Sequence, residues 1–120
     1  MNKIVYKRVY DLDDSDRQRV LVDRLWPRGQ SKEDLQIDEW PKEITPSNDI
    51  RKDYHEGKMD YDDFADAYKQ ELADNETADD FIKTLKELLE NDDVTLTTSV
   101  KDVEHSHIPT LRNYIKKNID

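Results

Sequence analysis

The chain has 120 residues, of which 40% are charged, and its formal net charge at pH 7 is −10. This length predicts one domain, covering residues 1–120. The absence of cysteine excludes disulfides and thiolate chemistry. No apolar stretch approaches the length of a membrane span, so we expect a cytoplasmic protein with no membrane association.

The negative charge is concentrated in the middle of the sequence. Residues 1–32 carry a net charge of +3, residues 33–93 carry −14 and residues 94–120 carry +1. General binding to nucleic acid is not expected, because it relies on a broad basic face. A local cationic pocket is compatible with this distribution.

Three segments have the composition of strands, at residues 4–10, 18–23 and 94–100. The second contains three consecutive aliphatic residues, which suit a strand buried on both faces of a parallel sheet. The connection at residues 11–17 is short for a parallel crossover, and by itself it favours an antiparallel hairpin of the first two strands.

The remaining segments predict helices. Ser31 and Ser47 are expected to cap two short helices, and Asp60 and Thr77 two longer amphipathic ones. A last helix carries Pro109 in its first turn. The expected helices end near Ile37, Gly57, Leu72, Asn91 and Ile119. Together the elements predict an α/β fold, a short, mostly parallel sheet with helices packed on it.

A cluster of polar and aromatic residues follows the second strand. Arg24 and Arg28 flank Trp26 in this turn, and open α/β sheets bind ligands beyond the carboxyl ends of their strands. The two guanidinium groups suit a carboxylate or a phosphate, and the indole suits a flat ligand. In the alternative interpretation the arginines pair with Asp23 or Asp102, and Trp26 belongs to the core.

A second polar cluster follows the third strand. If the second and third strands are parallel, both clusters meet at one edge of the sheet. Asp102 and His107 are candidates for proton transfer there, and Lys101 for stabilising negative charge. In the alternative interpretation His105 or Ser106 caps the last helix and His107 forms only local hydrogen bonds.

Other chemistry is less well matched. A zinc or iron site formed by His105, His107 and Asp102 or Glu104 is an alternative, although a His-x-His pair does not share one face of a helix. Arg51 is a further candidate for anion binding. The chain has two glycines and no glycine-rich phosphate loop, so no organic cofactor is expected.

The motifs resemble those of the YeaO-like proteins, a compact branch of the bacterial family catalogued as domain of unknown function 488. The resemblance rests on residues 7–11, 19–29, 46–52 and 101–107 and covers nearly the whole chain. It implies a Rossmann-like α/β domain with parallel strands, in place of the hairpin, and it supplies no established activity. It implies a site formed by Arg24, Trp26, Arg28, Arg51, Lys101, Asp102, His105 and His107.

The sequence thus leads to one main hypothesis and two alternatives. The main hypothesis is a protein that binds an anionic small molecule, a nucleotide or phosphate ester, through its arginines and His105. It allows for a cofactor-independent hydrolase or lyase that uses Asp102, His107 and Lys101. The alternatives are a non-catalytic binding or regulatory module with an arginine and tryptophan surface, and a His/Asp metal site.

Overall fold

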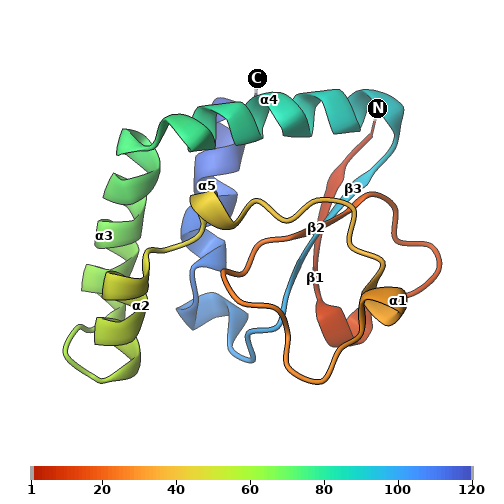
Figure 1. Ribbon diagram of the computed structural model, residues 1–120. Helices are drawn as coiled ribbons and strands as arrows, with labels where there is room; N and C mark the ends of the chain where they lie inside the picture. Colours follow the sequence, from red (N-terminus) through yellow and green to blue (C-terminus); the bar gives the residue numbers. More distant parts are fainter. Residues whose placement is uncertain (1, 120) are drawn as a thin grey trace.

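The computed structural model describes residues 2–119 and has an α/β fold (Figure 1). Its sheet contains β1 (Ile4–Arg8), β2 (Arg19–Leu21) and β3 (Val94–Thr98) in the order β1-β3-β2. Both outer strands pair in parallel with β3, so the parallel arrangement is confirmed and the hairpin is wrong.

The chain must cross from the end of β1 back to the start of β2 for the two strands to run in the same direction. A short connection can do this because the strands are short. A ten-residue connection, residues 9–18, begins with a 3-10 helix at Val9–Asp11 and reaches the start of β2. A chain segment of that length extends to about 33 Å, whereas a five-residue strand is only about 17 Å long. A helix is therefore not needed for the crossover.

The strands end earlier than the sequence patterns predict. Leu21 is the last residue of β2, and the Val22 N–H still donates to the Thr97 carbonyl at 3.0 Å. β3 ends at Thr98. Asp23, two residues after β2, and Ser99, directly after β3, bind each other instead of continuing the sheet.

The five α-helices are α1 (Lys32–Leu35), α2 (Asn48–His55), α3 (Tyr61–Asp74), α4 (Glu76–Asn91) and α5 (Ile108–Asn118). The side chains of Ser31, Ser47 and Asp60 accept hydrogen bonds from backbone N–H groups at the starts of α1, α2 and α3, which confirms these three caps. Pro109 lies in the first turn of α5, as predicted.

The predicted cap at Thr77 is wrong, because α4 begins two residues earlier, with Asn75 as its cap. Asn75 is the single residue between α3 and α4, and its side-chain oxygen accepts a hydrogen bond from the Thr77 N–H at 2.9 Å. α1 is shorter than predicted because Gln36 adopts a left-handed conformation with φ of 46°, which ends the helix.

The two faces of the sheet have separate apolar clusters. Val20 and Val22 contribute to the larger cluster with α3, α4 and α5, whereas Leu21 joins a smaller one with Val9 and Leu35. Successive side chains of a strand point to opposite faces, so the three aliphatic residues serve both. Figure 1 shows α3 and α5 side by side on the helical face, with α4 crossing above them.

Within residues 2–119, no helix is long and apolar enough to cross a lipid bilayer.

Tyr68 supports the helical face through a buried hydrogen bond. Its side chain is 1% exposed, and its hydroxyl donates to the Ile44 carbonyl at 2.7 Å. We expect Tyr68→Phe to lower the free energy of unfolding by about 1–3 kcal/mol, because the Ile44 carbonyl stays buried but loses its hydrogen-bond donor. Urea unfolding measures this loss. Tyr10→Phe, at a side chain 53% exposed, is the control and should have no effect; equal stabilities for Tyr68→Phe and the wild type would contradict the prediction.

Candidate functional site

A cleft of about 520 Å³ lies beyond the carboxyl ends of β2 and β3. The turn after β2, helices α2 and α3, and the segment between β3 and α5 form its lining. The parallel pairing of the two strands brings these segments together. The lining includes all the residues that the sequence indicated: Arg24, Trp26, Arg28, Arg51, Lys101, Asp102, His105 and His107.

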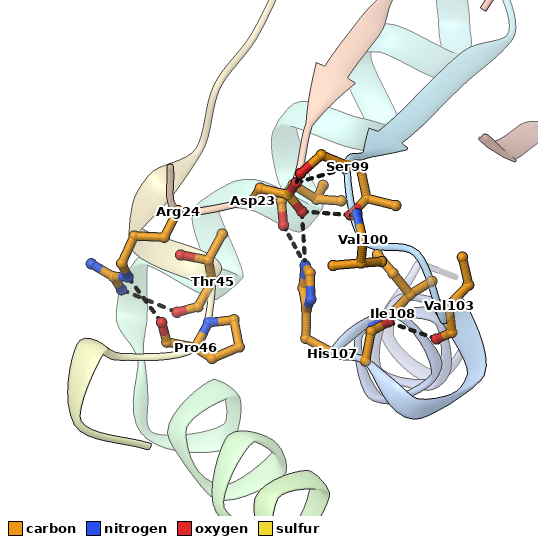
Figure 2. Close-up of polar contacts among 12 residues, drawn as sticks. Asp23, Arg24, Thr45, Pro46, Ser99, Val100, Val103, His107 and Ile108 are labelled. Atoms are coloured by element: carbon orange, nitrogen blue, oxygen red, sulfur yellow. Dashed lines mark hydrogen bonds and ion pairs between the residues drawn. The ribbon is translucent and has the colours of Figure 1, made fainter. Parts of the chain in front are cut away.

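Asp23, at the centre of this arrangement, connects the ends of the two strands. Its carboxylate accepts hydrogen bonds from Thr98 Oγ1 at 2.6 Å, from the Ser99 N–H at 2.7 Å and from Ser99 Oγ at 2.8 Å. Figure 2 shows Ser99 beside the carboxylate of Asp23, a residue that is 8% exposed.

His107 approaches the same carboxylate from the start of α5. Its Nε2 lies 2.6 Å from the Val22 carbonyl oxygen and 3.4 Å from Asp23 Oδ1. A carbonyl only accepts hydrogen bonds, so Nε2 carries a proton and donates it to Val22. His107 is therefore bound to the end of β2 by a buried hydrogen bond and a close carboxylate.

The buried carboxylate of Asp23 is the ionised form. Burial raises the pKa of Asp23, but the hydrogen bond and charge of His107, together with the donors of Thr98 and Ser99, outweigh burial and lower the pKa below its usual value. The folded state thus binds the proton of Asp23 less readily than the unfolded chain does.

The sequence suggested Asp102 as the partner of His107 in proton transfer. Asp102 lines the same cleft, but its carboxylate is bound to His105 and not to His107. Asp102 Oδ2 is 2.8 Å from His105 Nδ1, and both side chains are exposed. His107 faces Asp23 instead. From its sequence, Asp23 is predicted only as a possible salt-bridge partner of the arginines. The available signal was a carboxylate placed directly after three buried aliphatic residues.

Arg24 is engaged by backbone carbonyls. Its Nε donates to the Pro46 oxygen at 2.9 Å and its Nη2 to the Thr45 oxygen at 3.2 Å (Figure 2). The predicted alternative, an ion pair of Arg24 with Asp23 or Asp102, is therefore wrong. Arg24 ties the turn after β2 to the segment that leads into α2, and so it shapes the cleft.

The other three cations of the cleft lack acidic partners. Arg28 and Lys101 are exposed, and Arg51 Nη2 donates to Asn48 Oδ1 at 3.1 Å. The Nε of Arg51 is buried without a hydrogen-bond partner within residues 2–119. Across the same residues, neither these three side chains nor Arg24 forms an ion pair with Asp or Glu.

Trp26 serves both the core and the cleft. It packs on the cluster of Val9, Leu21 and Leu35, and its ring meets Trp40 edge-on at 5.4 Å between centroids. Its indole N–H donates to the Gln30 carbonyl at 2.7 Å. The remaining surface of this half-buried side chain lines the cleft, so Trp26 is partly a core residue.

Tyr54 forms part of the opposite wall. It stacks on Phe64 at 4.5 Å between ring centroids, and its hydroxyl donates to the His105 carbonyl at 2.9 Å. This bond joins α2 to the segment before α5. Two walls of the cleft are thus held by side chains bound to backbone carbonyls.

Neither His105 nor Ser106, the two caps that the sequence suggested, is the residue directly before α5. That residue is His107, whose side chain forms no capping hydrogen bond, although Ser106 Oγ accepts a hydrogen bond from the Ile108 N–H at 3.1 Å. His105 and His107 bind different carboxylates. Within residues 2–119, no group of three or more His, Cys, Asp or Glu side chains is arranged to hold a metal ion.

The fold and the cleft define an α/β protein with a cationic cleft at the carboxyl ends of parallel strands. The chain belongs to the DUF488 family, since a family model described as "Inactive DUF488-N3 subclade" matches residues 3–120. It is 43% identical to the Escherichia coli K12 protein named "Uncharacterized protein YeaO" over 111 residues, 92% of this chain and 94% of that protein.

Mycobacterial proteins are also similar to the chain. "Uncharacterized protein Rv3073c" of Mycobacterium tuberculosis and "Uncharacterized protein Mb3100c" of Mycobacterium bovis are each 39% identical over 105 residues, 87% of this chain and 86% of each relative. No solved structure matches the chain.

The contacts of Asp23 predict a pH-dependent effect of Asp23→Asn. An amide cannot satisfy the same set of donors, so we expect the free energy of unfolding at pH 7 to fall by about 1–3 kcal/mol. Because the pKa of Asp23 is lowered by folding, the stability it contributes is present above the ordinary carboxyl pKa and is lost as the pH falls through the folded pKa. The difference between variant and wild type should therefore shrink at pH 3.

Urea unfolding at pH 7 and pH 3 tests this prediction. Asp14→Asn, at an exposed loop residue, is the matched control and should remain close to the wild type at both values. A stability difference for Asp23→Asn that stays constant between the two pH values would show that the ionised carboxylate is not the stabilising form.

Proposed function

We propose that this protein binds an anionic small molecule, a phosphate ester or nucleotide, in the cleft and does not turn it over. The observation that carries this proposal is a group of cations without acidic partners in a chain whose formal net charge is −10. Arg28, Arg51 and Lys101 supply N–H donors that a phosphate accepts well.

Arg51 gives the strongest support for a ligand of this sign. Its buried Nε has no hydrogen-bond partner within residues 2–119. A buried donor without an acceptor costs about 1–3 kcal/mol, and an anion in the cleft offers an acceptor. Arg28, on the turn after β2, contributes a second guanidinium from another wall.

Binding without turnover is favoured by two observations. The matching subclade is described as inactive. In addition, His107 is hydrogen-bonded to the Val22 carbonyl, and Asp102 is paired with the exposed His105 instead of with a buried base. These contacts account for the histidines and Asp102 as parts of the binding site without a proton-transfer step.

Thermal unfolding in the presence of inorganic phosphate, pyrophosphate and AMP tests the proposal. A ligand at about 100 times its Kd adds roughly 2.7 kcal/mol, which raises the Tm of a domain of this size by several degrees. We expect this rise in the wild type and its loss in Arg28→Ala, because Arg28 is exposed and its removal spares the core.

Arg17→Ala is the matched control, since it removes the same charge from an exposed side chain that does not line the cleft. Its response to the anions should equal that of the wild type. A rise in Tm that survives in Arg28→Ala, or is equally lost in Arg17→Ala, would reject the cleft as the anion site. No rise with any of the three probes would favour the alternative of a protein partner that contacts the exposed Leu25 and Arg28.

A further inference from the structure

Hydrogen-bond direction determines what the deepest part of the cleft offers to a ligand. We call Asp23, Ser99 and His107 the floor, because they join the ends of β2 and β3 and all line the cleft. The question is which atoms of the floor still have a free donor or acceptor.

Asp23 has little acceptor capacity left for a ligand. Its Oδ1 accepts from Thr98 Oγ1 and lies 3.4 Å from His107 Nε2, and its Oδ2 accepts from both the N–H and the hydroxyl of Ser99. Three hydrogen bonds occupy most of the roughly four lone-pair sites of this buried carboxylate. Asp23 therefore orients its neighbours and leaves ligand contacts to them.

The hydroxyl of Ser99 presents an acceptor to the cleft. Its proton is donated to Asp23 at 2.8 Å, and no group within residues 2–119 donates to its oxygen. The neighbouring Thr98 differs, because its buried hydroxyl both donates to Asp23 and accepts from the Val100 N–H. Of these two hydroxyl groups, the half-buried Ser99 is the one whose oxygen accepts no hydrogen bond within residues 2–119.

His107 presents a second acceptor. Its Nε2 proton is directed at the Val22 carbonyl, so Nδ1 is the ring nitrogen that accepts a hydrogen bond when the imidazole is uncharged. Nδ1 has no hydrogen-bond partner within residues 2–119, and it is not among the buried atoms that lack one, so it keeps some access to solvent. The floor thus offers two acceptors, whereas the surrounding cations offer only donors.

Resting on the proposed anion binding, we propose that the ligand is a hydroxylated phosphate ester whose hydroxyl groups donate to Ser99 Oγ and His107 Nδ1. The ionised Asp23 repels a phosphate from the floor, while Arg28, Arg51 and Lys101 attract it. A ligand that carries a phosphate and hydroxyl groups provides acceptors for the cations and donors for the acceptors of the floor. A phosphate ester without hydroxyl groups leaves the two acceptors of the floor unpaired.

Calorimetric titration with matched probe pairs tests this inference. The pairs are glycerol 3-phosphate against propyl phosphate, and ribose 5-phosphate against tetrahydrofurfuryl phosphate, which differ only in their hydroxyl groups. The titrations are carried out at pH 8. We expect the hydroxylated member of at least one pair to bind about tenfold more tightly, as one or two hydrogen bonds provide.

Ser99→Ala separates ligand contact from a structural role. The variant retains the backbone N–H that donates to Asp23 and removes the free oxygen. The hydroxylated probe should bind about five- to tenfold more weakly, whereas the Kd of its partner should stay unchanged. Ser15→Ala, in an exposed loop, is the control and should leave both values unchanged.

The outcomes distinguish this inference from the function on which it rests. Equal affinity within both pairs overturns the inference and leaves anion binding in place. Equal weakening of both members in Ser99→Ala also overturns it, because the serine then acts through the shape of the cleft. If neither the probes nor inorganic phosphate bind, the anion-binding proposal fails and this inference fails with it.

Discussion

The buried carboxylate of Asp23 is the contact on which the rest of the site depends. It binds Thr98, the last residue of β3, and Ser99, which follows it, and it faces His107 at the start of α5. The end of β2 is thereby joined to the end of β3 and to the start of α5. A buried charge is tolerated only when donors surround it, and here four polar contacts do so. The same contacts determine the direction of every hydrogen bond on the floor.

The walls of the cleft are held by a different kind of contact. Arg24 binds the carbonyls of Thr45 and Pro46, and Tyr54 binds the carbonyl of His105. Each bond joins segments that are not neighbours in the sequence and uses an acceptor that no secondary structure occupies. The cleft is therefore formed before any ligand arrives, which reduces the ordering that binding would require. Arg28, Arg51 and Lys101 remain available because these structural tasks fall to other side chains.

The charge distribution separates the cleft from most of the acidic residues. Most of the acidic residues lie in residues 33–93, which contain α2, α3 and α4, whereas the cations of the cleft come mainly from the segments after β2 and β3. A negatively charged surface disfavours broad contact with nucleic acid, and the cations of the cleft are a local exception to it.

The sequence by itself determined the helices capped by Ser31, Ser47 and Asp60, the buried second strand, and the two clusters that meet in the cleft. These features follow from periodicity and from contacts within a few residues, which a local pattern records. The short connection between the first two strands favoured an antiparallel hairpin, which is wrong, and their parallel direction was implied by the family resemblance. Only the tertiary structure decided that β3 lies between β1 and β2 and that His107 faces Asp23 instead of Asp102. Such partners are separated by 84 residues in the sequence and are chosen by the packing of strands and helices, which no local pattern contains.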